Sequence, residues 1–176
     1  MIEKFKTLFA VKSSLICLYL ALTIPIPFLS SEKLKMLSIF AFIVGLFLII
    51  NITNDHVTTC EDRISYKTSL ISRILGKKGW EISWKEIVSI KSFPTSQGSK
   101  VHYFSTIDSK NFLVPQRIEN FERFLLIITK KTNLQIKELT YLSPLWTYKL
   151  LTFFSVLMIL GEIISLKYQI LSMLNL

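Results

Sequence analysis

Hydrophobic and polar positions alternate along the middle of the chain with the two-residue period of half-buried strands. Between residues 63 and 70, one face carries Ile64, Tyr66, Thr68 and Leu70, and the other carries charged or small polar residues. The same alternation recurs at residues 80–84, where two tryptophans and an isoleucine alternate with polar side chains. This pattern predicts an antiparallel sheet with one buried and one solvated face.

The stretch 79–93 predicts a strand, one tight turn and a second strand. Ser83 and Glu86 fit the S-x-x-E pattern, in which a serine hydroxyl and a glutamate cap one helical turn reciprocally. The β-branched residues Ile87, Val88 and Ile90 then favour a second strand. The polar and glycine-containing segments around this stretch predict turns, and the flanking segments predict further strands at residues 57–60, 101–107 and 112–114.

After Pro115 the period of the apolar residues changes from two to between three and four. Ile118, Phe121, Leu125 and Ile128 recur on one side of a helix that we expect over residues 117–132. We interpret this stripe as the core-facing side of a helix that closes the sheet, and an exposed membrane-binding face is the alternative. Asn133 is a suitable stop for this helix.

Three long apolar runs predict transmembrane helices, at residues 13–29, 36–52 and 145–166. A short polar link joins the first two runs, so they should form an antiparallel hairpin. Both are apolar on every face, which favours a membrane hairpin over a buried hairpin of a soluble protein. No small-residue cleavage motif follows the first run and a second span comes at once, which argues against a cleaved signal peptide.

The third run contains polar residues with distinct expected roles. Trp146 and Tyr148 lie at its start, where interfacial aromatic side chains anchor a span. Glu162 is a candidate intramembrane polar site, because acids inside spans are often functional. The alternative, which we favour, is that Glu162 lies one turn from the end of the helix near Lys167 and reaches water.

About half of the residues are hydrophobic and the formal charge is +9, a combination that favours a membrane protein over a soluble one. The basic residues are interleaved with acids and form no aromatic–basic platform, so we expect no nucleic acid. Arg73, Lys77 and Lys78 are the candidate contacts for anionic lipid or a partner. The distribution of lysine and arginine places the amino terminus and the polar region on the cytoplasmic side.

Candidate catalytic chemistry is sparse. The glycines form no phosphate-binding loop or dinucleotide fingerprint, and there is no nucleophile elbow or H-E-x-x-H pair. Asp55, His56, Cys60 and Asp62 form the one group with metal-capable atoms, but alternation along a strand would send them to opposite faces. The two cysteines lie in dissimilar segments and predict no disulfide. We therefore expect no enzyme activity, no cofactor, no metal and no small-molecule substrate.

Three segments carry a family resemblance: Asp62–Tyr66, Trp80–Ile90 and Phe112–Pro115. With the closing helix and the two preceding spans, this order resembles the bacterial pleckstrin-homology-like domains of small membrane proteins. The resemblance implies a bent antiparallel sheet capped by one C-terminal amphipathic helix, without the phosphoinositide ligand of the eukaryotic domains. The architecture is also similar to the photosystem I assembly membrane proteins of cyanobacteria and plastids, although the third span departs from that pattern.

We therefore expect a membrane α + β protein with three parts: a transmembrane hairpin in residues 1–52, a pleckstrin-homology-like domain in residues 53–137, and a linker with the third span in residues 138–176. The expected role is a scaffold or assembly factor that contacts another integral membrane protein in a bacterial inner membrane or a thylakoid. A binding module for anionic lipid headgroups is one alternative. An enzyme or transporter subunit that depends on Glu162 is another.

Overall fold

The computed structural model of the protein describes residues 2–96, 98–134, 141 and 143–174, and the chain divides into two compact units. The first unit takes in residues 1–9 and 51–144, and the second takes in residues 10–50 and 145–176. The chain therefore enters the first unit, leaves it for the apolar hairpin and then returns to it. The expected end of the domain at residue 137 lies outside the described residues.

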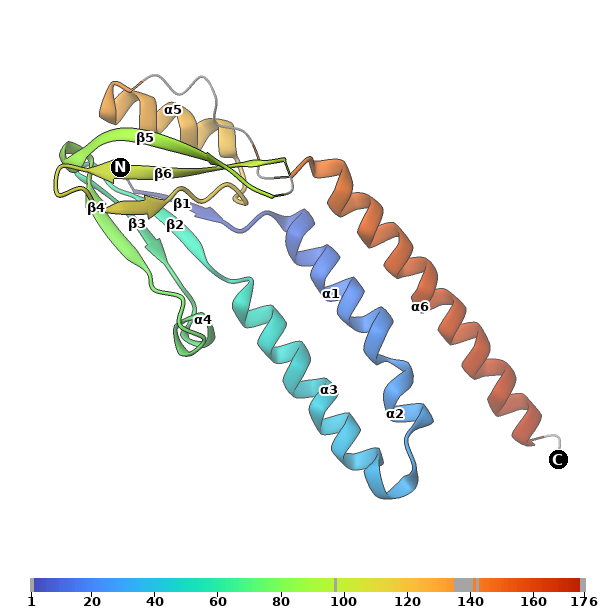
Figure 1. The fold of residues 1–176 in the computed structure, drawn as a ribbon. Coiled ribbons are helices and arrows are strands. Elements are labelled where there is room, and N and C mark those ends of the chain that lie inside the picture. Colours follow the sequence, from blue (N-terminus) through green and yellow to red (C-terminus); the bar gives the residue numbers. More distant parts are fainter. Residues whose placement is uncertain (1, 97, 135–140, 142, 175–176) are drawn as a thin grey trace. The chain divides into compact units, whose positions relative to one another are not determined.

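The first unit contains two antiparallel sheets and one long helix (Figure 1). The four-stranded sheet has the order β1-β2-β3-β4, formed by β1 (Glu3–Lys6), β2 (His56–Thr59), β3 (Arg63–Lys67) and β4 (Trp80–Ser83). The three-stranded sheet has the order β5-β6-β7, formed by β5 (Ile87–Pro94), β6 (Lys100–Thr106) and β7 (Asn111–Leu113). The predicted mixture of helices and antiparallel strands is confirmed.

Strand β1 precedes the apolar hairpin and pairs with β2, which follows it. The register joins Glu3 to Thr59 and Lys6 to His56. An isolated bridge between Thr7 and Ile118 extends this strand on its other side. The hairpin expected in residues 1–52 includes these first residues, and β1 is not predicted, because four residues with three charged side chains carry little strand signal.

A short 3₁₀ turn connects the two sheets, as the S-x-x-E pattern predicts. The turn η1 (Trp84–Glu86) has the expected capping box, in which the Ser83 amide donates to Glu86 Oε2 at 3.1 Å. Trp84 is buried, and its indole Nε1 donates to the carbonyl oxygen of Cys60 at 3.0 Å. This hydrogen bond fixes the turn against the loop between β2 and β3.

The closing helix α5 (Phe121–Thr132) completes the core of the first unit. Its apolar side buries Phe121, Phe124 and Ile128, and the ring of Phe124 meets that of Phe5 edge-on at 5.4 Å. The prediction that this stripe forms core is therefore confirmed. The helix starts four residues later than expected, after Asn120 in a left-handed conformation, and it ends at Asn133 as predicted.

A second, short helix was not predicted. The sequence pattern extended a strand as far as Leu70, but β3 ends at Lys67 and α4 (Leu70–Ile74) begins after Ser69. The side chain of Ser69 accepts a hydrogen bond from the backbone nitrogen of Ser72 at 3.2 Å and caps the helix. This local cap overrides the alternation, and Leu70, expected on the buried face, is exposed instead.

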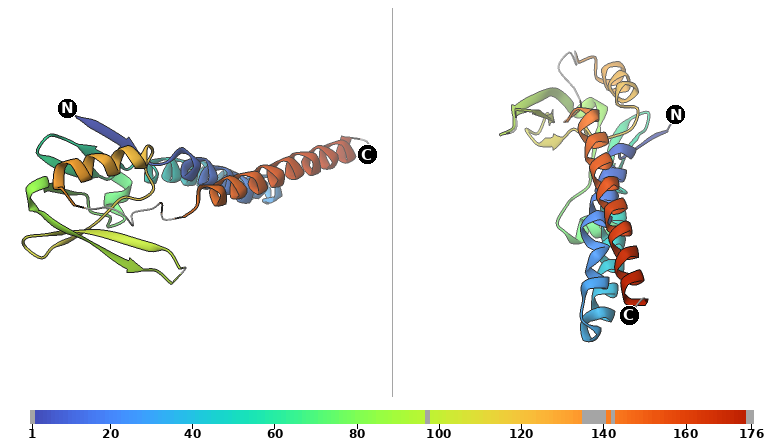
Figure 2. Two further views of the ribbon diagram at one scale, coloured as in Figure 1. Left: turned by 90° about the horizontal axis from the view of Figure 1, so that it is seen from above. Right: turned by 90° about the vertical axis from the view of Figure 1, so that its right-hand side faces the viewer.

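The second unit consists of apolar helices: α1 (Phe9–Thr23), α2 (Pro25–Leu29), α3 (Glu32–Ile52) and α6 (Leu145–Leu174). Among the described residues, three segments are long and apolar enough to cross a membrane, namely Phe9–Leu29, Glu32–Ile52 and Leu145–Tyr168. They include the three predicted spans and extend them. Figure 2 shows the helices of this unit running alongside one another.

One tight contact joins α1 to α3. The hydroxyl of Tyr19 donates to the carbonyl oxygen of Phe42 at 2.8 Å, and the two rings stack with centroids 5.8 Å apart. A β-carbon at Gly45 would lie 2.3 Å from the Tyr19 hydroxyl, so any other residue there would force the Tyr19 side chain to move. This contact pairs the two helices of the hairpin.

Candidate functional site

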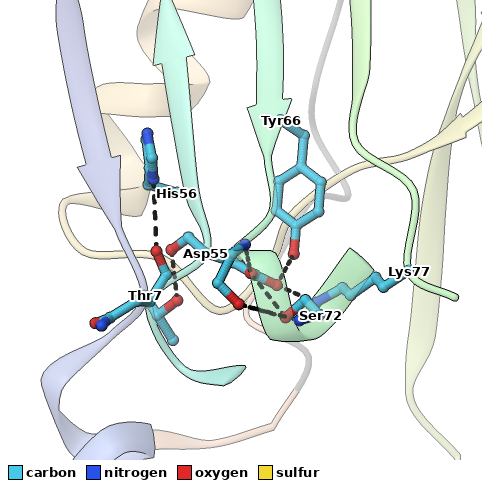
Figure 3. A network of polar contacts seen from close by, with 8 residues as sticks. Thr7, Asp55, His56, Tyr66, Ser72 and Lys77 are labelled. Carbon is cyan, nitrogen blue, oxygen red and sulfur yellow. Dashed lines mark hydrogen bonds and ion pairs between the residues drawn. The ribbon is translucent and has the colours of Figure 1, made fainter. Parts of the chain in front are cut away.

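A buried carboxylate organises the polar cluster of the first unit. Asp55 lies three residues beyond the end of α3 and immediately before β2. It is 5% exposed, which is unusual for an acidic residue unless it is paired. The polar groups around it come from β3, α4 and the loop that follows α4 (Figure 3).

Four donors surround the Asp55 carboxylate. Its Oδ1 accepts from the backbone nitrogen of Ser69 at 2.9 Å and from Ser72 Oγ at 3.1 Å. Its Oδ2 accepts from the Tyr66 hydroxyl at 2.9 Å and pairs with Lys77 Nζ at 2.5 Å. Both oxygens therefore have partners, and the charge is balanced by one ammonium group.

The pKa values in this cluster follow from these contacts. Burial alone raises the pKa of Asp55, but hydrogen bonds from Lys77, Ser69 and Tyr66 together outweigh it and hold the pKa below its ordinary value. Burial lowers the pKa of Lys77, and the hydrogen bond to Asp55 reverses this and raises it. An ionised carboxylate held by four donors is a poor base, so its geometry suits anchoring rather than proton transfer.

The cluster also joins the two chain segments that border the hairpin. Thr7, which directly follows β1, donates its hydroxyl to the backbone carbonyl oxygen of Asp55 at 2.9 Å. His56 is the next residue, and burial is the main cause that lowers its pKa. The point where the chain leaves the first unit is therefore bonded to the point where it returns.

Helix α4 has an unusual distribution of polar and apolar side chains. Ser72 is 1% exposed and faces Asp55, whereas Leu70 is 75% exposed, Ile74 83% and Leu75 67%. We call these three apolar residues the α4 surface. An element of a soluble domain normally buries such side chains and exposes its serines.

The three basic residues predicted to act together differ in their surroundings. Arg73 and Lys78 are exposed; in the sequence, Arg73 lies between Leu70 and Ile74 of the α4 surface, and Lys78 follows Leu75 by three residues. Lys77 turns inward to Asp55 and lies 5.2 Å from the centroid of the Tyr66 ring. The structure thus gives Lys77 a place in the buried cluster and leaves the other two directed to solvent.

The group of metal-capable residues does not assemble. Within the described part of the chain, no three His, Cys, Asp or Glu side chains lie where they could hold a metal ion. Asp55 is occupied by the four donors, and Cys60 contributes its backbone carbonyl to Trp84. Neither Cys17 nor Cys60 is in a disulfide.

The polar residues of α6 share one face of that helix. Tyr148, Ser155 and Glu162 are spaced by seven residues, and Ser155 is 1% exposed. The Tyr148 hydroxyl and Glu162 Oε2 are shielded, with no hydrogen-bond partner among the described residues. The helix continues to Leu174, but its candidate membrane span ends at Tyr168, next to the expected end near Lys167. Trp146 is 62% exposed, as an interfacial anchor would be.

One open cavity, of about 230 Å³, lies between β1 and the start of α5. Its walls include an ion pair between Arg123 Nε and Glu3 Oε2 at 2.8 Å. This volume is below the roughly 300 Å³ at which small-molecule sites begin. The Asp55 cluster and the α4 surface are therefore the stronger candidates for a functional site.

Comparisons with known proteins show similarity to an uncharacterized protein but to no family model. No protein-family model matches the chain. The chain is 29% identical over 155 residues to an uncharacterized protein of the cyanobacterium Synechocystis, an alignment that covers 84% of this chain and 77% of that protein. Each unit is shorter than the aligned region, so the similarity includes residues of both the sheet-containing unit and the apolar helices.

Proposed function

We propose that the protein is a membrane-anchored, non-catalytic interaction module that serves as a scaffold or assembly factor for another integral membrane protein. Three transmembrane helices would hold a pleckstrin-homology-like domain on the cytoplasmic side of the membrane. The single observation that carries this proposal is the pairing of β1 with β2 across the apolar hairpin. It makes the apolar hairpin an insertion within the chain of the domain rather than an addition at one end of it.

The arrangement of the first unit supports the pleckstrin-homology-like assignment. Four strands form one antiparallel sheet, three form a second, and one amphipathic helix follows the last strand. The helix fills the core with Phe121, Phe124 and Ile128. This is the order of elements that the family resemblance implies.

The second unit supports membrane insertion. Helix α3 buries none of its residues, although 14 of its 21 side chains are large and apolar. An apolar surface of this extent is unstable in water and requires lipid or other helices to cover it. A domain fixed at a membrane surface meets other membrane proteins at high effective concentration, which favours a scaffold role.

The Asp55 cluster supports an anchoring role over catalysis. Its carboxylate accepts four hydrogen bonds within the protein and offers no open position to a substrate. The cyanobacterial relative is compatible with a thylakoid location. Assembly of a photosystem is therefore the more specific form of this proposal.

The proposal is tested by purifying the full-length, C-terminally tagged protein from its host membranes in mild detergent after crosslinking. We expect defined membrane proteins to be recovered in constant proportion to the bait. The matched variant is Phe5→Ala, which weakens the domain core and leaves the apolar helices intact. Loss of the partners from this variant would assign binding to the domain. Recovery of the same partners with Phe5→Ala, or of none with the wild type, would contradict the proposal.

A further inference from the structure

We propose that the α4 surface docks the domain on the lipid bilayer. In this proposal Leu70, Ile74 and Leu75 insert at the level of the lipid headgroups, and Arg73 and Lys78 contact anionic phosphates. The occupant of the surface is thus the membrane itself, not a protein. The inference rests on the membrane anchoring proposed above and is independent of the identity of any protein partner.

The first argument is that α4 is reversed relative to an ordinary surface element. Its polar side is the buried one, since Ser72 is 1% exposed and donates to Asp55 Oδ1 at 3.1 Å. Its apolar side faces outward, with Ile74 83% exposed. The orientation is therefore fixed by hydrogen bonds to the serine side of the helix, and the apolar side needs a nonpolar environment outside the domain.

The second argument is that this surface is held in place before it meets any ligand. The Ser69 cap, the Asp55 carboxylate and Lys77 hold the start and the end of the segment. Backbone hydrogen bonds of 3.0 Å from Leu75 to Ile71 and of 2.9 Å from Lys77 to Ser72 close the loop. Gly76, at φ 86°, makes the sharp turn that side-chain-bearing residues rarely adopt. A preformed surface loses little conformational entropy when it binds.

The third argument selects lipid as the occupant. Asp55 follows Ile52, the last residue of α3, by three residues, and three residues of chain span at most about 10 Å. Because Asp55 is bonded directly to α4, this surface is tied to the end of a predicted transmembrane helix. Large apolar side chains beside Arg73 and Lys78 are the composition of segments that lie in the interface of an anionic bilayer.

The test uses the full-length protein in nanodiscs made of equal amounts of phosphatidylcholine and phosphatidylglycerol. Cys17 and Cys60 are replaced by serine, and an environment-sensitive NBD fluorophore is attached to Ile74→Cys. The matched control carries the label at Leu126→Cys on α5, where the native side chain is 70% exposed. We expect blue-shifted emission, quenching by doxyl-labelled lipids and protection from iodide at position 74, and the reverse at position 126.

A second pair of variants tests the contribution of charge. Arg73→Glu with Lys78→Glu should lower the ratio of docked to undocked domain by at least about fivefold per residue, since each basic side chain near an anionic surface adds about that factor. Lys85→Glu with Lys91→Glu, at two other exposed lysines, is the control and should leave the ratio unchanged. Nanodiscs of phosphatidylcholine alone should reproduce the effect of the first pair.

Two results would overturn the inference. Iodide quenching as strong at position 74 as at position 126 would mean that the α4 surface stays in water. Protection from iodide without quenching by doxyl lipids would mean that protein covers it, either a second copy or another part of the same chain. Both readouts come from the purified protein and lipid, so they are separate from the failure or success of the partner purification.

Discussion

At the scale of single residues, Asp55 connects segments that are distant in the sequence. Its carboxylate receives Tyr66 from β3 and Lys77 from the loop after α4, and its backbone carbonyl receives Thr7 from the amino-terminal segment. The three contacts span 11, 22 and 48 residues of chain. Asp55 thus connects β3, the loop after α4 and the segment that precedes the hairpin.

Replacing Asp55 by asparagine should destabilise the first unit by about 2 kcal/mol, because the amide nitrogen would face hydrogen-bond donors and Lys77 would lose its counter-charge. The measurement is guanidinium unfolding of the detergent-solubilised full-length protein, followed by the fluorescence of Trp80 and Trp84 in a Trp146→Phe background. The control is Asp108→Asn at a carboxylate that is 74% exposed, where a change within about 0.5 kcal/mol is expected. Equal effects of the two substitutions would contradict an anchoring role for Asp55.

The same carboxylate predicts a pH dependence with a definite sign. The pKa of Asp55 is lower in the folded protein than its ordinary value of about 4, so the folded state binds fewer protons than the unfolded state. Its contribution to stability is complete above that value and is lost as the pH falls through the folded pKa. Unfolding midpoints measured from neutral pH down to about pH 3 should therefore fall more steeply for the wild type than for Asp55→Asn. Parallel curves of unfolding midpoint against pH for the two proteins would contradict a lowered pKa of Asp55.

The residues of this cluster could be only partly predicted from the sequence. The sequence indicates Asp55 as a metal-capable residue and Lys77 as a lipid contact, but their pairing depends on a short helix that the sequence pattern does not reveal. Two residues 22 positions apart in a chain without a repeat carry no local signal of contact. Conversely, Ser83 and Glu86 cap each other within one turn, so the sequence predicted them correctly.

At the scale of elements, hydrophobic periodicity predicts most strands and the closing helix of the first unit. Strands β2 to β7 and helix α5 follow alternation or helical spacing over several residues, and all are present within a few residues of their expected bounds. The two missed elements, β1 and α4, have four and five residues and depend on partners far away or on a single serine cap. Short elements that depend on tertiary contacts cannot be predicted from the periodicity of the local sequence.

Strand β1 should contribute to the stability of the whole first unit. Phe5 is 4% exposed and packs edge-on against Phe124, so Phe5→Ala should cost about 3 kcal/mol. The same unfolding experiment measures this loss. Ile2→Ala is the matched control, since Ile2 is 74% exposed and its truncation should change stability by less than about 0.5 kcal/mol. A neutral Phe5→Ala variant would show that the domain folds without its amino-terminal strand.

At the scale of the whole molecule, the sheet constrains how the chain would cross a membrane in the proposed arrangement. Because β1 and β2 are hydrogen-bonded neighbours, the segments on either side of the hairpin must lie on one side of the bilayer. Two crossings, by Phe9–Leu29 and Glu32–Ile52, satisfy that requirement, whereas an odd number of crossings between β1 and β2 would not. The distribution of basic residues favours the cytoplasm as that side.

This constraint predicts the accessibility of introduced cysteines in intact cells that make the Cys17→Ser, Cys60→Ser protein. A cysteine at Ser31, between the first two helices, should react with a membrane-impermeant maleimide from outside. Cysteines at Ile2 and Ser96, both exposed residues of the first unit, should react only after the membrane is permeabilised. Opposite accessibility of Ile2→Cys and Ser96→Cys would contradict the pairing of β1 with β2.

The position of β1 also orders the events of biosynthesis. Glu3 leaves the ribosome first, but its strand partner Thr59 follows 56 residues later, and Arg123, which pairs with Glu3, follows 120 residues later. The apolar hairpin is translated within that interval and can enter the membrane while β1 still lacks a neighbour. Domain closure must then wait for α5. In the proposed membrane protein, the nascent chain would therefore be anchored before the first unit is complete, and a chain released early would retain the hairpin and an unfinished sheet.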